Sequence, residues 1–157
     1  MPLALVTGAS RGIGRASAIE LADAGFDLVQ SLTKMREGLI VFSDDLPLLK
    51  ALKRDSIKDL YVEMSPGYQM GRCYAFSRKS GIPPLATNRV YLLDDHQFFL
   101  HRILRAVSLN TKLSRLGQAD TCRPHDVLMP PARMIDQYPH APAALRNTVR
   151  VGDAAFS

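Results

Sequence analysis

The sequence lacks the features that would place the chain in a membrane or outside the cell. No apolar run approaches the roughly 20 residues that a helix needs to cross a bilayer. The segment after Met1 carries neither a basic stretch nor a cleavage site of the kind found in signal peptides. Cysteine is scarce: the two that are present, Cys73 and Cys122, stand in no CxxC pair and in no metal-ligand spacing. We therefore expect a cytoplasmic location, no membrane partner and unpaired thiols.

The chain also lacks internal repeats, low-complexity tracts and a strong excess of one charge. Its net charge of +5 is spread along the sequence, which permits a polyanionic partner without indicating a site for one. Hydrophobic residues make up 46% and charged residues 22%, close to the average for soluble domains, so disorder is not expected. A length of 157 residues is enough for one domain with a buried core.

Short apolar runs alternate with segments of helical periodicity through most of the chain. This alternation predicts an α/β fold built from β-α units with a mostly parallel sheet or barrel, followed by a short helical tail. In the last β-α unit, Leu100, Leu104 and Val107 recur on one face of a helix that Asp94 and Asp95 can cap. Strands are expected at residues 3–6, 39–42, 60–64 and 85–88, and residues 26–32 are compatible with a further strand. Helices are expected at residues 12–24, 47–54, 69–80, 94–107, 132–138 and 141–153, with an irregular connection over 117–131.

A glycine-rich motif joins the first expected strand to the first expected helix. It reads Thr7-Gly8-Ala9-Ser10-Arg11-Gly12-Ile13-Gly14. In this context Gly8 allows a sharp turn, Gly12 lets the backbone approach a pyrophosphate, and Gly14 lets the helix pack closely on the strand. The amide groups at the start of the helix would face the phosphates of a dinucleotide.

The motif and the residues that follow it, through Leu28, resemble the start of the short-chain dehydrogenase/reductase family. The resemblance implies that Ser10, Arg11 and Ile13 line the phosphate and ribose of NAD(P). Because Arg11 suits a 2′-phosphate, the resemblance implies that the cofactor is NADP in preference to NAD. The cofactor-binding residues expected on this basis are Gly8, Ser10, Arg11, Gly12, Ile13 and Gly14.

The catalytic part of that family is not present in this sequence. The family uses a Tyr with a Lys four residues later, and no tyrosine here has a lysine at that offset. Tyr74 has Arg78 at the right distance and Lys79 one residue late, and arginine does not replace lysine in this geometry. No acidic residue ends the segment 26–32, where NAD enzymes bind the ribose. We therefore expect no working reductase and assign no catalytic residue.

From Gly38 onward the sequence resembles a different family, the PHP domain (polymerase and histidinol phosphatase) of the bacterial DNA polymerase III alpha subunit. The matching segments, in order, are residues 38–43, 60–64, 81–88, 100–107, 134–138 and 142–148. The resemblance implies a partial barrel followed by linker helices, an association with DNA replication, and contact with DNA or other replicase parts through a polymerase body. The palm, which carries the catalytic acids of that polymerase, is absent from this sequence.

PHP domains bind metals through His, Asp and Glu at strand ends, and this sequence departs from that pattern. The family's late strand ends Asn-Asp-Val-His, whereas this chain reads Asn88-Arg89-Val90-Tyr91. A protonated arginine cannot be a metal ligand, and tyrosine is a poor substitute for imidazole. No metal site is therefore expected.

The other polar residues have simpler interpretations than catalysis. His96 and His101 are five residues apart and do not share a helix face, and we interpret His125 and His140 in the same way, as surface or partly satisfied side chains. The acidic pairs at 44–45 and 94–95 stand where helices begin, so capping explains them. Residues 98 and 99, both Phe, are expected to fill a core or to contact the polymerase body.

These observations predict three segments: a Rossmann-type strand-turn-helix fragment at 1–30, a partial PHP-like α/β domain at 38–110, and a linker with a helical tail at 111–157. The preferred hypothesis is a non-catalytic fragment of a polymerase III alpha-like protein. The alternative is an NAD(P)-binding Rossmann-like module in which the later β-α units extend the sheet. A third possibility is that the sequence is a coding artefact and makes no stable protein. Because a unit from one fold must pack on another, we also expect exposed apolar surface and self-association.

Overall fold

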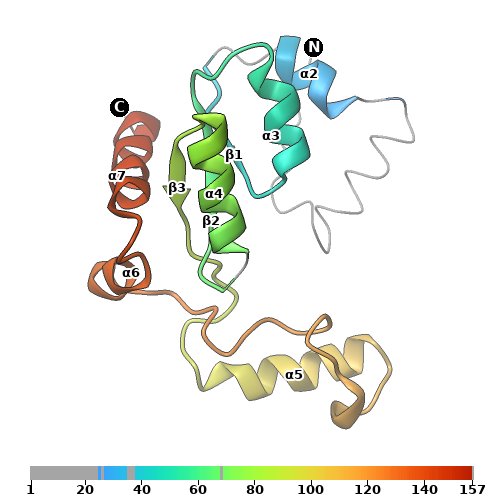
Figure 1. Cartoon of the computed structure of the whole chain (residues 1–157). Helices are drawn as coiled ribbons and strands as arrows, with labels where there is room; N and C mark the ends of the chain where they lie inside the picture. The colour runs from blue at the N-terminus through green and yellow to red at the C-terminus, as the bar shows by residue number, and fades with distance from the viewer. Residues whose placement is uncertain (1–24, 26, 35–37, 68, 157) are drawn as a thin grey trace.

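The computed structural model describes residues 25, 27–34, 38–67 and 69–156, and its fold is α/β (Figure 1). Three parallel strands form one sheet in the order β1-β2-β3. The strands are β1 (Val41–Ser43), β2 (Leu60–Met64) and β3 (Pro84–Ala86). The predicted α/β class with parallel β-α units and a helical tail is therefore confirmed.

The central strand is the one that the sequence predicted best. β2 occupies residues 60–64 as expected, and four of its five residues are buried. The two outer strands are shorter than predicted, and both are displaced by one or two residues from the predicted ranges. The strand and helix predicted at 3–6 and 12–24 lie outside the described residues.

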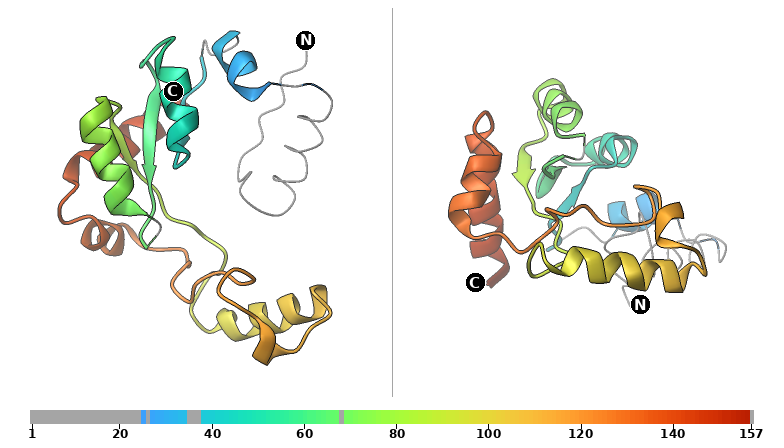
Figure 2. Two further views of the ribbon diagram at one scale, coloured as in Figure 1. Left: turned by 45° about the vertical axis from the view of Figure 1, so that its right-hand side comes forward. Right: turned by 90° about the horizontal axis from the view of Figure 1, so that it is seen from below.

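Two helices lie on one face of the sheet, as the right-handed crossovers between parallel strands require (Figure 2). α3 (Leu46–Lys53) begins at Asp45, whose carboxylate accepts a hydrogen bond from the amide of Leu48 at 3.0 Å. α4 (Met70–Ser80) ends at Gly81, which adopts a left-handed conformation with φ of 75°. Both helices match their predictions, because their caps are local signals in the sequence.

The interpretation of residues 26–32 as a strand is wrong, because α2 (Leu28–Lys34) is a helix. Asp27 stabilises its start by accepting a hydrogen bond from the amide of Gln30 at 2.9 Å. Val29 and Leu32, three residues apart on one helix face, pack into the core. Capping and this burial therefore determine the structure of the segment.

A single apolar core joins the sheet to the surrounding helices. Its fully buried side chains include Leu49 and Leu52 of α3, Leu60 and Val62 of β2, and Ile82 in the turn before β3. Tyr138, Ala141 and Ala144 from the C-terminal part belong to the same cluster. The tail therefore stabilises the β-α units as part of their core.

The last helix covers the open edge of β3. α6 (Pro131–Gln137) and α7 (Pro142–Phe156) match the two helices predicted in the tail. From α7, Asn147 Nδ2 donates to the carbonyl of Pro84 at 2.7 Å, and Thr148 Oγ1 donates to the carbonyl of Ala86 at 2.6 Å. Side chains therefore satisfy edge carbonyls that would otherwise be open to pairing with another strand.

Residues 88–130 form an arm that leaves the sheet after β3 and returns before α6 (Figure 1). The arm carries α5 (Gln97–Ser108) and a short 3-10 helix, η1 (Leu113–Arg115). A bridge between Leu92 and Val127 closes its base. A small separate cluster of Leu92, Cys122 and Val127, with Phe98 and Met129 against it, forms the apolar interior at this base.

One face of α5 is apolar and exposed. Leu100, Leu104 and Val107 share that face as the periodicity predicted, but they are 56%, 59% and 73% exposed. Phe99 is also exposed, whereas Phe98 packs in the cluster at the base of the arm. The structure therefore leaves this helix face uncovered by any described residue. Within the described ranges, no helix has the length and apolar character that crossing a membrane requires.

Candidate functional site

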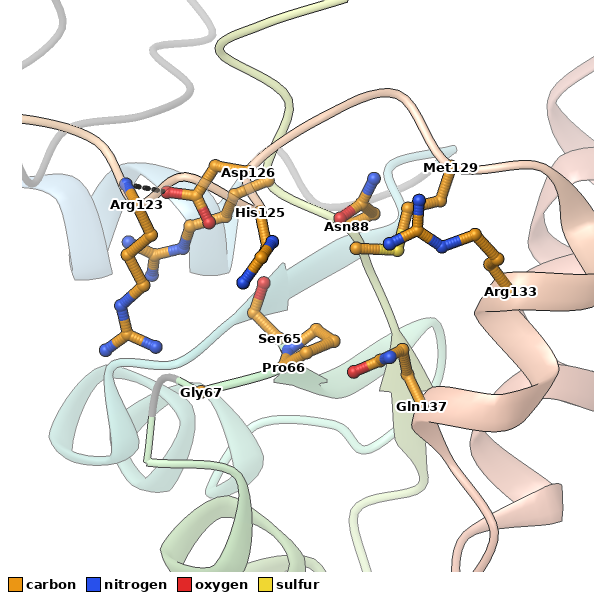
Figure 3. Close-up of a pocket in the computed structure, with 11 residues that line it drawn as sticks. Ser65, Pro66, Gly67, Asn88, Arg123, His125, Asp126, Met129, Arg133 and Gln137 are labelled. Atoms are coloured by element: carbon orange, nitrogen blue, oxygen red, sulfur yellow. Dashed lines mark hydrogen bonds between the residues drawn. The ribbon is translucent and has the colours of Figure 1, made fainter. Parts of the chain in front are cut away.

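A cavity of about 370 Å³ lies where β2 and β3 end (Figure 3). The carboxyl ends of parallel strands are the usual place for ligand sites in α/β proteins. The returning part of the arm and α6 close the cavity from the other side. Its described lining residues are Ser65, Pro66, Gly67, Asn88, Arg89, Arg123, His125, Asp126, Met129, Arg133 and Gln137.

Ser65, directly after β2, has a buried hydroxyl without a partner. The residue is 3% exposed, and its Oγ atom forms no hydrogen bond with any described residue. Leaving a buried polar group unsatisfied destabilises a fold by about 1–3 kcal/mol, so such groups are uncommon and call for an explanation. Figure 3 shows this hydroxyl pointing toward the space between His125 and the end of β2.

Gly67 brings the backbone into close contact with Arg123. The glycine adopts a φ of 72°, which side chains other than glycine rarely adopt. A Cβ atom here would also overlap the Nη1 atom of Arg123. The amide of Arg123 in turn donates to Oδ2 of Asp126 at 2.9 Å. The turn after β2 thus leaves room for the Arg123 guanidinium group at the cavity wall.

Asn88 and Arg89 follow β3 and fix the opposite side of the strand ends. Asn88 Nδ2 donates to the carbonyl of Val127 at 2.7 Å, which ties the start of the arm to its end. Arg89 Nη2 forms an ion pair with Oδ2 of Asp44, the residue after β1, at 2.9 Å. A guanidinium group therefore neutralises the acidic residue at the neighbouring strand end.

The strand ends do not assemble a metal site from the described residues. No group of three or more His, Cys, Asp or Glu side chains is close enough to hold a metal ion in the part of the chain that the structure describes. Tyr91, one of the residues after β3, is 55% exposed.

A second polar cluster lies beneath the strand ends and has a structural role. Tyr138 is 2% exposed, and the single hydrogen of its hydroxyl is shared between the carbonyls of Met64 and, at 2.7 Å, Thr87. Burial raises the pKa of Tyr138 well above its ordinary value. Burial also raises the pKa of Glu63, and the hydrogen bond from Thr87 Oγ1 at 2.8 Å partly opposes that rise. Burial therefore shifts the pKa of each side chain in the direction that favours its neutral form.

The residues predicted to bind a dinucleotide cannot be placed in this site. Gly8, Ser10, Arg11, Gly12, Ile13 and Gly14 all lie outside the described residues. Tyr74, on α4, packs half-buried against the core. His101, on α5, accepts a hydrogen bond from the amide of Cys122 at 3.1 Å, and burial lowers its pKa. The interpretation of His101 as a partly satisfied side chain therefore agrees with its hydrogen bond.

The polar and charged residues that line the cavity were not predicted from the sequence. Ser65 and Gly67 directly follow a strand that was predicted correctly, so the rule that ligands bind at carboxyl ends could have identified them. No local signal connects Arg123, His125 or Arg133 to those positions. Only the return of the arm brings these residues to the strand ends.

The cavity is therefore lined by a buried hydroxyl, by a turn whose backbone lies close to a guanidinium group, and by several cationic side chains. Such a set can bind and orient an anionic group, and it offers no nucleophile paired with a base among the described residues. A comparison of the chain with protein-family models and with curated proteins finds no match.

Proposed function

We propose that residues 38–156 are a non-catalytic module related to the PHP region of the bacterial DNA polymerase III alpha subunit, with a role in DNA replication. The segments that resemble that family occur here as successive β-α units of one parallel sheet, followed by α5, α6 and α7. This order supports the proposal, since the family resemblance consists of short segments in a fixed order.

The ion pair between Arg89 and Asp44 carries the non-catalytic part of the proposal. In the family, acidic and imidazole side chains at the strand ends bind metal ions for phosphoester hydrolysis. Here the residue after Asn88 is a cation that contacts Asp44 at 2.9 Å. A guanidinium group in that position repels a metal ion and occupies the carboxylate that could bind one. The module would then serve as a scaffold.

The exposed face of α5 supports a partner of polymerase type. Leu100, Leu104 and Val107 form a row three and four residues apart, and each is more than half exposed. Contiguous exposed apolar surface of this kind is typical of protein contacts. A polymerase body that follows or accompanies the module would cover this face.

Binding to a polymerase III alpha chain that lacks its own PHP region tests the proposal. We expect a saturable complex in isothermal titration calorimetry, weakened about tenfold by Leu104→Glu, which corresponds to about 1.4 kcal/mol. Val149→Glu on α7 is the matched control, because Val149 is 65% exposed and lies away from α5. A folded chain that does not bind the polymerase, or that hydrolyses p-nitrophenyl phosphate with Mn²⁺, would contradict the proposal.

A second candidate function is NAD(P) binding, which the motif Thr7-Gly8-Ala9-Ser10-Arg11-Gly12-Ile13-Gly14 favours. In this hypothesis the module binds NADP in preference to NAD through Arg11, and has no reductase activity. Titration of the purified chain with NADP and NAD tests it. Saturable micromolar binding that Gly12→Val abolishes supports this candidate, and a cooperatively melting protein that binds neither cofactor eliminates it.

A further inference from the structure

The cavity at the strand ends offers hydrogen-bond donors from several directions. Ser65 lies at its floor, and Figure 3 shows Arg123 on one side of this serine and Arg133 on the other. A planar carboxylate accepts donors mainly within one plane, whereas a tetrahedral phosphate accepts them from three or more directions. The arrangement of donors therefore fits a phosphate better than a carboxylate.

The charge of the lining also favours a phosphate. The described lining residues include three arginines, Arg89, Arg123 and Arg133, against the single acidic residue Asp126. Oδ2 of Asp126 already accepts a hydrogen bond from the Arg123 amide. Arg133 has no ion-pair partner among the described residues. Arg89 is already paired with Asp44, so the remaining excess of positive charge comes from Arg123 and Arg133 against Asp126. A guanidinium group can bind two oxygens of one phosphate, so this lining favours an anionic phosphate group.

The buried hydroxyl of Ser65 is the observation that distinguishes this cavity from an ordinary basic surface. It is 3% exposed, forms no hydrogen bond with the described residues, and faces the cavity. An anion within the cavity would accept this hydroxyl hydrogen. Because Gly67 has no side chain, the Arg123 guanidinium can lie close to the backbone at the cavity wall.

We propose that this cavity binds a phosphate group, held by Ser65, Arg123 and Arg133 and supplied either as inorganic phosphate or by a nucleotide. The site uses residues 65–137 only, and the proposal does not depend on the polymerase relationship or on the motif at residues 7–14. Phosphate binding here requires no metal ion and no covalent step.

Calorimetric titration of the purified full chain with inorganic phosphate, thymidine 5′-monophosphate and thymidine tests the proposal. We expect saturable binding of the first two and none of thymidine. Tighter binding of the monophosphate than of phosphate identifies a nucleotide as the source, and equal binding identifies free phosphate. Absence of binding of both phosphate compounds to a cooperatively melting protein would overturn the proposal.

Substitutions of cavity residues test whether phosphate binds at this site. We expect Arg133→Gln to weaken phosphate binding about tenfold, about 1.4 kcal/mol, and Ser65→Ala to weaken it several-fold without loss of folding. Arg150→Gln on α7 is the control, because Arg150 is exposed and does not line the cavity. Binding that Arg133→Gln and Ser65→Ala leave unchanged lies elsewhere on the chain and refutes the assignment.

Discussion

Replacing Tyr138 with phenylalanine removes one hydroxyl from the point where the tail meets the sheet. The single hydrogen of this hydroxyl is shared between the carbonyls of Met64, at the end of β2, and Thr87, just after β3. Met64 keeps another partner, because the amide of Thr87 donates to its carbonyl at 2.9 Å. The carbonyl of Thr87 keeps no other hydrogen bond from the described residues. The phenyl ring itself stays in the same buried position.

The expected loss follows from that one unsatisfied carbonyl. Thr87 is only partly buried, so the loss should lie near the net value of one hydrogen bond, about 1 kcal/mol, while the buried apolar area is almost unchanged. We therefore expect Tyr138→Phe to lower the free energy of unfolding by about 1 kcal/mol in urea denaturation. The m-value should stay constant, since the surface exposed on unfolding does not change.

The pH dependence gives an independent check. Because burial raises the pKa of Tyr138, the folded state holds its proton more tightly than the unfolded chain does. The contribution of this group is complete below the unfolded pKa of about 10 and is lost as the pH rises from there toward the folded pKa. The wild type should therefore lose more stability than Tyr138→Phe in that range.

Tyr74→Phe is the matched control for this experiment. Tyr74 is half-buried on α4 and packs against the same core, but its hydroxyl forms no hydrogen bond with the described residues. We expect this variant to change stability by less than about 0.5 kcal/mol. An equal effect of both substitutions, or none for Tyr138→Phe, would refute the reasoning about the unsatisfied carbonyl.

Three further changes test the helix cap, the exposed helix face and the buried acid. Asp45→Ala removes the acceptor for the amide of Leu48 and should lower stability by about 1 kcal/mol in thermal denaturation; an unchanged melting temperature would contradict the cap. Leu100→Glu should change stability by less than about 0.5 kcal/mol, because the side chain is 56% exposed. If the chain self-associates through this face as predicted, sedimentation velocity should show weaker association for this variant than for the wild type. Glu63→Gln keeps an acceptor for Thr87. Because burial raises the pKa of Glu63, the wild type loses stability as the pH rises above about 4.3, and the variant should not show this loss in denaturation at a series of pH values.

Local signals explain which elements could be predicted from the sequence. β2 alternates between apolar and polar residues, α3 begins at an aspartate cap, and α4 ends at a glycine with positive φ. Each signal acts within a few residues, so it can be recognised without knowledge of the fold. The interpretation of residues 26–32 as a strand was based on their apolar residues alone. It was wrong because it took into account neither the cap at Asp27 nor the core that α2 joins.

The site required information that no local pattern contains. Ser65 and Asn88 follow strands, but their partners at the cavity come from the returning arm and from α6. The periodicity of α5 also could not show whether its apolar face is buried or exposed. It placed Leu100 and Leu104 on one face, yet the same spacing describes a helix buried in a core and a helix left open to a partner.

The arm has a consequence for how the chain can change in evolution and in the laboratory. Its two ends meet at the hydrogen bond between Asn88 and Val127 and at the bridge from Leu92. Between residues 93 and 121, Phe98 packs against the small cluster at the base, and no residue of this segment belongs to the core of the sheet, so the arm behaves as an insertion. Replacing residues 93–121 with a short turn would keep the sheet and its core helices continuous, and would yield a minimal version of the protein. If the exposed face of α5 contacts a partner as proposed, lengthening or exchanging the same segment would change that contact without altering the residues of the sheet core.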